Sequence, residues 1–328
     1  MRSGRAAVAV ACVLAAIAIA VTPLPAGGAP PRCNGAADLC ARRLDQVAFA
    51  TTHNSMASSA DGFVPPNQRR RMAAQLDHGI RAFQIDAYFG TPRGGRVYTD
   101  LSGPLGHAAE LPPAAVRGAE LIHRSLGAPP AGTPYDVYLC HVFCELGAVR
   151  MLDEMKVVRA FLDTHPREVL VMVIEDYLPP AAIRDVFRAA GLESQLLPVD
   201  VSALPTLGEM IDRGTRLQVS LERGSDPPIL PNAFTGLVQE TPFTFRRPRD
   251  LERPSSCSTN RGTDGAPVFQ FNHWVTPAEP VTATRVNTSI LRERIVECTA
   301  ARKRGPTLVA VDFAEQGDLL GVVDRLNR

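Results

Sequence analysis

Polar side chains that can do chemistry stand at the ends of four apolar segments in the first half of the chain. They are His53 and Asn54 after the first segment, Gln84 and Asp86 in the second, His141 after the third, and Glu175 in the fourth. Two imidazoles can divide acid–base work, since one takes a proton from an attacking hydroxyl and the other protonates a leaving oxygen. Carboxylate and amide oxygens suit Ca²⁺ or Mg²⁺. The combination favours phosphoryl transfer assisted by a divalent cation.

The elements that must position these side chains alternate along the chain. Eight apolar runs rich in Val, Ile, Leu and Phe are expected to be strands, at 46–53, 80–88, 137–141, 169–176, 216–222, 237–243, 268–274 and 308–313. Helical segments are expected between them, at 67–77, 114–126, 148–164, 181–190, 207–213 and 290–303. Alternating strands and helices indicate a parallel sheet with crossover helices, and eight is the strand number of a TIM barrel. We predict an α/β fold, a TIM-like (β/α)8 barrel in a single domain.

The carboxyl ends of parallel barrel strands meet at one rim, where loops build the active site. This rim would bring the catalytic candidates His53 and His141 to the oxygen donors. Strand alternation puts Gln84 and Asp86 on the same face. Asp312 ends the last strand, beside the first strand of a closed barrel, so it could orient His53 as a dyad carboxylate. Its alternative role is to cap the segment 315–326.

Three further residues of the expected rim are candidates for substrate contacts. Glu222 shares a strand face with Gln218 and Ser220, so its carboxylate would point into the barrel. Tyr177 and Trp274 follow two other strands and could accommodate an apolar or sugar portion of a substrate.

Charge and the first residues bear on partners and location. Lys plus Arg number 35 and Asp plus Glu 34, which argues against nucleic acid as a partner. Arg2 and Arg5 precede an apolar run at 6–21 and then small residues, the layout of a secretory signal. We predict a signal peptide at 1–29, cleaved near Ala26 or Ala29, and a secreted, monomeric protein of residues 30–328. A lipoprotein anchor at Cys33 is the rival interpretation, although residues 29–32 do not resemble a lipobox.

Six cysteines follow the predicted signal, and an even count in an exported chain suggests disulfides. Six cysteines allow 15 pairings. Proximity in the chain favours Cys33 with Cys40 and Cys140 with Cys144, which leaves Cys257 with Cys298. The alternative is a zinc site formed by Cys140, His141 and Cys144, although the usual ligand spacings of zinc sites are absent.

Several sequence motifs occur in a fixed order along nearly the whole mature chain. They are ATTHNS, QLDHGIRAFQIDAY, LCH, VLVMVIEDY, FQFNHW and LVAVDFAEQGDLLGVV. The first four resemble the X-domain core of phosphatidylinositol-specific phospholipases C, and the last two resemble the secreted bacterial, fungal and plant branch of that superfamily. The resemblance implies that His53 and His141 are catalytic and that Asn54, Asp86 and Glu175 bind a metal. Gln84 departs from the family pattern, but its amide oxygen shares a strand face with Asp86 and is expected to be a fourth ligand.

The same resemblance implies a reaction and a cofactor. A hydroxyl of the head group of a phosphodiester lipid would attack the lipid's own phosphorus. The enzyme would contact the membrane surface transiently, and its cofactor would be Ca²⁺ rather than Mg²⁺. Metal-dependent members usually carry an acidic residue where Gln84 stands, and an amide cannot accept a proton at ordinary pH. Metal-independent members have Arg in place of Asp86 and Asp in place of Asn54. This chain lacks both of those residues, so a cation is expected.

Two other interpretations of the chain stay open at this point. One is a phosphodiesterase for a different head group, although such relatives usually show a Glu-x-Asp pair where this chain has Gln84 and Asp86. The other is a lipid or inositol-phosphate binding protein that has lost catalysis, which Gln84 keeps open.

Overall fold

The computed structural model describes residues 31–101, 113–127, 133 and 135–328. Residues 32–328 form one compact unit. The predicted signal peptide lies outside the described residues. Within the described part of the chain, no helix has the length and apolar character needed to cross a membrane.

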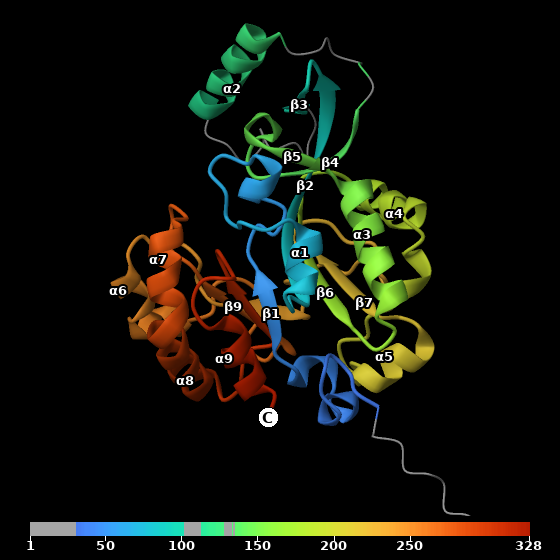
Figure 1. Ribbon diagram of the computed structural model, residues 1–328, viewed down its shortest axis with the longest axis vertical. Helices are drawn as coiled ribbons and strands as arrows, with labels where there is room; N and C mark the ends of the chain where they lie inside the picture. The colour runs from blue at the N-terminus through green and yellow to red at the C-terminus, as the bar shows by residue number, and fades with distance from the viewer. Residues whose placement is uncertain (1–30, 102–112, 128–132, 134) are drawn as a thin grey trace, which may run out of the picture. The chain divides into compact units, whose positions relative to one another are not determined.

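Seven parallel strands form the barrel wall (Figure 1). Their spatial order is β8 (Val238–Glu240), β9 (Val268–His273), β10 (Leu308–Val311), β1 (Phe49–Thr52), β2 (Ala82–Arg93), β6 (Leu170–Asp176) and β7 (Leu217–Leu221). The first and last strands of the chain are neighbours, with Thr52 opposite Val311. Each of the seven corresponds to a predicted strand. The structure confirms the TIM-like barrel.

The expected strand at 137–141 is not part of this parallel wall, so the prediction of its place was wrong. It forms β4 (Asp136–Cys140), which pairs antiparallel with the outer half of β2 and with β5 (Ala148–Arg150). β2 runs for 12 residues, and its extension beyond the barrel also pairs with β3 (Arg96–Thr99). β6 already occupies the parallel position beside the inner half of β2. The long β2 therefore carries a small antiparallel lobe that delivers His141.

Helices flank the parallel strands, as expected for crossover connections. They are α1 (Met72–Asp77), α3 (Met151–Thr164), α4 (Pro180–Ala189), α5 (Leu207–Arg213), α8 (Leu291–Arg302) and α9 (Leu319–Leu326), with the shorter α6 (Pro248–Leu251) and α7 (Pro280–Arg285) and, beside the lobe, α2 (Pro113–Leu126). α5 illustrates how local sequence sets helix ends. A capping box of Thr206 and Glu209 satisfies its first N–H groups, and Gly214, at φ 74°, ends it in the left-handed conformation that glycine adopts readily.

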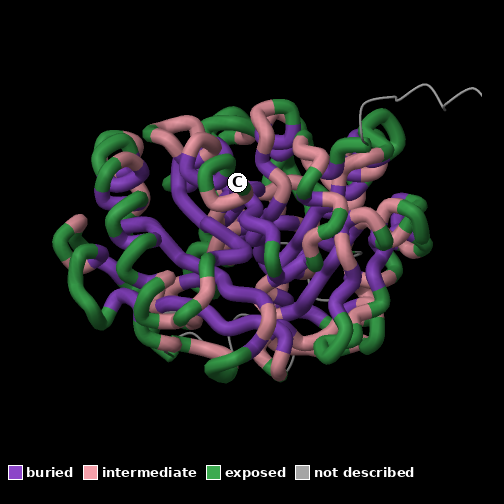
Figure 2. The backbone as a smooth tube through the Cα atoms, turned by 90° about the horizontal axis from the view of Figure 1, so that it is seen from below, coloured by how far each residue is buried: buried purple, intermediate pink, exposed green. Residues whose placement is uncertain are grey.

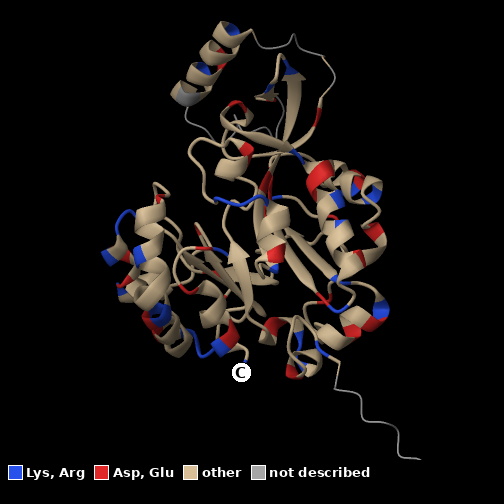
Figure 3. Ribbon diagram, in the orientation of Figure 1, with Lys and Arg blue, Asp and Glu red and all other residues tan. Residues whose placement is uncertain are grey.

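Buried residues follow the barrel strands (Figure 2). Alternation along each strand divides their side chains into two clusters, one inside the barrel and one between the strands and the helices. Val171 and Val173 of β6 point into the barrel, where they join a cluster with Phe49 and Leu308. The alternate residues of β6, such as Met172, pack outward against helices α3 and α4. Charges of both signs are interspersed over the outer helices (Figure 3).

The three predicted disulfides are confirmed. Cys33 is bonded to Cys40, Cys140 to Cys144, and Cys257 to Cys298. Both cysteines of the alternative zinc site are therefore bonded to each other, which rules that site out.

Candidate active site

A pocket of about 110 Å³ opens at the carboxyl ends of the barrel strands. Seven of the predicted site residues line it: His53, Asn54, Gln84, Asp86, Glu175, Glu222 and Trp274. The pocket is also lined by Glu240, Arg261, Gln270 and Asn272, which makes its walls unusually polar for a barrel interior. The rim predicted from the strand ends is where these side chains meet.

His53 and Asp312 form a hydrogen-bonded pair. His53 Nδ1 donates to Asp312 Oδ1 over 2.8 Å, and Asn67 Nδ2 donates to the same oxygen over 3.0 Å. Gln68 holds the two strand ends together, because its Nε2 donates to the carbonyls of His53 and Val311. This leaves the Nε2 of His53 as the nitrogen available to a substrate, with the ring orientation fixed as in a catalytic dyad.

The ring of His53 is also stacked on Trp274. The two ring centroids lie 3.6 Å apart with an interplanar angle of 8°. Trp274 is only 5% exposed, and its other neighbours include Phe243, whose ring centroid is 6.5 Å away. The predicted substrate-contacting Trp274 therefore contacts His53 as well as lining the pocket.

His141 does not line this pocket, but it lies within the electric field of the dyad. The pKa of His141 is lowered to about 4, chiefly by burial and also by the charge of His53, while Asp312 acts in the opposite direction. The disulfide between Cys140 and Cys144 encloses the histidine in a short loop. His141 is thus neutral near pH 7 in the free protein.

The residue after each of His53, His141 and Asp312 has left-handed backbone geometry. These residues are Asn54 (φ 43°), Val142 (φ 65°) and Phe313 (φ 47°). Only five non-glycine residues of the described chain have a positive φ, and for a β-branched residue such as Val142 the conformation is costly. Strain of this kind clusters at functional sites, so its recurrence beside all three residues supports their grouping.

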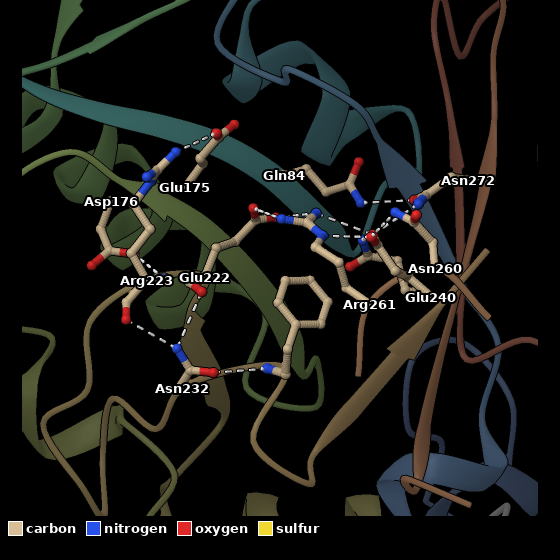
Figure 4. Close-up of polar contacts among 12 residues, drawn as sticks. Gln84, Glu175, Asp176, Glu222, Arg223, Asn232, Glu240, Asn260, Arg261 and Asn272 are labelled. Carbon is tan, nitrogen blue, oxygen red and sulfur yellow. Dashed lines mark hydrogen bonds and ion pairs between the residues drawn. The ribbon is translucent and has the colours of Figure 1, made fainter. Parts of the chain in front are cut away.

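Acidic side chains dominate the β2–β6–β7 side of the pocket. Burial raises the pKa of Asp86 well above its usual range, the charges of Glu175 and Glu222 raise it further, and Arg223 opposes them. Glu175 accepts hydrogen bonds from the hydroxyl of Tyr177 and from Arg223 Nη2, the latter over 3.3 Å (Figure 4). Tyr177 lies under Arg223, 4.1 Å from ring centroid to guanidinium, and does not line the pocket.

Arg261 is the main positive charge on the opposite side of the pocket. Its guanidinium lies between Glu222 and Glu240, with contacts of 2.6 Å and 2.5 Å respectively (Figure 4). Glu240 is fully buried and also accepts from Asn260, Gln270 and Asn272. Burial raises the pKa of Glu222, and the nearby charge of Arg261 opposes that shift.

The four predicted metal ligands are compatible with a hard cation. Asn54, Gln84, Asp86 and Glu175 all line the pocket, and the buried Oε1 of Gln84 has no hydrogen-bond partner among the described residues. A cation would also relieve the charge that burial disfavours on Asp86. No group of three or more His, Cys, Asp and Glu side chains in the described chain is arranged for a metal. Amide oxygens would therefore have to complete the ligand set.

Comparison with known proteins decides the family. A family model described as PI-PLC X 1 matches residues 130–327, more than half of the chain. The chain belongs to the PI-PLC X family. The matched range contains His141, Glu175 and Asp312, whereas His53 precedes it.

Two fungal relatives match this PI-PLC X chain over most of its length. A PI-PLC X domain-containing protein of Arthroderma benhamiae is 25% identical over 323 residues, which cover 90% of this chain and 89% of the relative. A second protein of that fungus, described as an uncharacterized secreted protein, is 24% identical and matches over 92% of this chain and 64% of its own length. A phosphatidylinositol-specific phospholipase C from Staphylococcus aureus has a TM-score of 0.51 at 13% identity, covering 88% of this chain and 94% of that chain. This structural likeness shows the shared fold.

Sequence reasoning did not identify Arg261 or Glu240 as members of the site. Glu240 lies two residues after the inward-facing Val238 in β8, so the two side chains share a face of the strand. A firm strand prediction would therefore have placed Glu240 inside the barrel. Arg261 lies between β8 and β9 in the irregular segment 258–267, where neither periodicity nor spacing indicates direction. Its two carboxylate partners are 39 and 21 residues away in the chain.

Proposed function

We propose that this protein is a phosphodiesterase of the phospholipase C type that cleaves an inositol phospholipid. The observation that carries the proposal is the His53–Asp312 pair, at 2.8 Å, on the edge of a pocket lined by four side chains whose oxygen atoms can bind a cation. A histidine held by a carboxylate is a ready general base, and a polar pocket beside it fits a phosphorylated polyol.

In the proposed reaction a hydroxyl of the inositol ring attacks phosphorus. His53 takes the proton of that hydroxyl, and Asp312 stabilises the imidazolium that results. His141 gives a proton to the leaving oxygen of diacylglycerol, so the products are diacylglycerol and a cyclic inositol phosphate. The negative phosphate would favour the protonated form of His141 in the complex, against the burial that opposes it in the free protein.

We further propose that Asn54, Gln84, Asp86 and Glu175 hold Ca²⁺. When bound, Ca²⁺ would neutralise the phosphate as negative charge develops in the transition state. Asp86 and Glu175 would supply the ligand charge, and Glu175 would exchange its contact with Arg223 for the cation. Gln84 would supply the oxygen that has no partner in the described chain.

The proposed setting is outside the cell, at a membrane surface that the monomeric enzyme contacts transiently. Three disulfides are typical of exported proteins, and one relative is described as secreted. The predicted signal at 1–29 would direct export. A lipid substrate requires that the pocket approach a bilayer.

The decisive experiment assays purified residues 30–328 against phosphodiester lipids with different head groups, with Ca²⁺ or with EGTA. We expect cleavage of phosphatidylinositol, and a loss of at least about 100-fold in kcat for His53→Ala or His141→Ala. Activity within about tenfold of wild type in either variant would refute the roles given to the histidines. Cleavage of another head group alone would redirect the substrate assignment, and lipid binding without turnover at any Ca²⁺ level would favour a binding protein.

A further inference from the structure

The barrel wall has a seam between β7 and β8. Among the described strands, β7 pairs with β6 and β8 pairs with β9, and no ladder joins β7 to β8. Beside β7 the described chain contributes only isolated bridges, between Leu196 and Leu217 and between Leu221 and Asn232. Glu222 directly follows β7 and Glu240 ends β8, so each carboxylate lies at one side of this seam.

The side chain of Arg261 spans the seam. Its Nη1 donates to Glu222 Oε2 over 2.6 Å and its Nε donates to Glu240 Oε1 over 2.5 Å. Nη2 completes the arrangement with the second oxygen of each carboxylate, at 3.3 Å and 3.2 Å. The guanidinium also lies over the rings of Phe234 and Phe243, at 4.1 Å and 5.2 Å from their centroids.

Arg261 is fixed to the β8 side by its own backbone. Asn260 N–H donates to the Glu240 carbonyl, and Glu240 N–H donates to the Arg261 carbonyl, at 2.9 Å and 3.1 Å. The next residue, Gly262, approaches β8 so closely that a Cβ would lie 2.0 Å from the Val238 carbonyl oxygen. Because β8 and this segment form one unit, the guanidinium links that unit to the carboxylate of Glu222 (Figure 4). The backbone of Ala233 gives a second link across the seam, since its N–H donates to the Leu221 carbonyl and its carbonyl accepts from the Val238 N–H.

We propose that Arg261 is a positioning residue that closes the barrel between β7 and β8 and so fixes Glu222 at the spacing the head group requires. The inference rests on the proposed function, because it takes the head group as the ligand of this pocket. It adds a residue that determines how well a substrate fits without taking part in proton transfer. His53 and Asp312 lie on the β1–β10 side of the barrel and make no hydrogen bond to Arg261 in the described structure.

Arginine suits this task better than lysine. A planar guanidinium offers five N–H donors in a fixed fork, so it can serve two carboxylates at once. Lysine keeps the charge but is a point donor, and it would leave one of the two buried carboxylates poorly paired. Arg261→Lys therefore tests the bridging geometry while retaining the positive charge.

The test compares Arg261→Lys with Arg184→Lys on a soluble inositol phosphodiester at saturating Ca²⁺. Arg184 is a matched control, because it also bridges two acidic residues, Glu193 and Asp226, but on the surface at α4 and away from the pocket. We expect Arg261→Lys to raise KM by about 10- to 100-fold with kcat within about threefold, and Arg184→Lys to change neither. An unchanged KM, or a loss confined to kcat, would overturn the proposal.

A double-mutant cycle with Glu222→Gln separates bridging from a general loss of charge. If Arg261 acts through Glu222, Arg261→Lys in the Glu222→Gln background should change KM by less than about threefold. Multiplicative effects on KM would contradict the coupling.

The same cycle measured by thermal melting without substrate is independent of turnover. We expect Arg261→Lys to lower Tm by about 5 °C alone and by much less in the Glu222→Gln background. Additive Tm losses would overturn the closure of the seam even if the enzyme is active. Coupled Tm losses in a protein that cleaves no phosphodiester would support the closure and refute the proposed function alone.

Discussion

His141 should make the stability of this protein depend on pH in a defined window. The pKa of His141 falls from 6.5 to about 4 on folding, chiefly because burial disfavours its charged form. Between these values the unfolded chain binds a proton at this position and the folded protein does not. The free energy of unfolding should therefore fall as the pH drops from 6.5 to 4. Above pH 6.5 both states have a neutral His141, and the free energy of unfolding should no longer be reduced by this residue.

The magnitude follows from the size of that change, which corresponds to about 3 kcal/mol at complete protonation of the unfolded state. His141→Asn removes this contribution without removing a polar side chain. The variant should therefore become more stable relative to wild type as the pH falls, so its free energy of unfolding should rise relative to that of wild type. The comparison cancels the other groups that titrate in the same range.

The assay is urea unfolding followed by far-UV circular dichroism at several values between pH 4 and 7.5, with the disulfides intact. His165→Asn serves as control, because it removes an exposed histidine from the end of α3. A wild-type-minus-variant difference that varies by less than about 0.5 kcal/mol over this range would refute the reasoning. It would mean that His141 is hydrated, and that the antiparallel lobe does not bury it beside the dyad.

Three other outcomes are expected. Ca²⁺ should raise Tm, and EGTA should abolish turnover. Asp86→Asn should lose much of its Ca²⁺ affinity and regain activity at high Ca²⁺. A Tm and a turnover rate that do not change with Ca²⁺ would contradict the proposed metal site. Trp274→Leu should lower kcat by about tenfold, because the indole is stacked on His53 at 3.6 Å; a change in KM alone would make Trp274 a substrate contact only. Removing the Cys140–Cys144 disulfide by a double Ala substitution should lower kcat more than the Cys33–Cys40 counterpart does, and equal kcat values would contradict a positioning role for the loop.

The sequence predicts those parts of the site that follow from the two-residue alternation of a strand and from the order of the strands along the chain. Alternation in β2 puts Gln84 and Asp86 on one face, and the adjacency of first and last strands in a barrel brings Asp312 to His53. The place of His141 could not be predicted in this way. The composition of a five-residue strand does not show whether it will pair in a parallel or an antiparallel direction. The direction of β4 is set by the length of β2, because the extension of β2 beyond the barrel pairs with β4.

Arg261 shows the other limit of sequence reasoning. Its position depends on a backbone segment without regular structure and on contacts between residues far apart in the chain. Local propensity carries no information about such contacts, because it describes neighbours along the chain. The disulfides were predictable for the opposite reason, since two of the three pairs are separated by only seven and four residues.

The antiparallel lobe on β2 has a consequence for how the family can vary. His53 directly follows β1 in the barrel wall, whereas His141 directly follows β4, which pairs with the outer half of β2 outside the parallel wall. Substitutions in β3 or β4 should therefore displace His141 more than His53. Exchange of this lobe would therefore replace one of the two proposed proton-transfer residues while the barrel that carries the other stays unaltered.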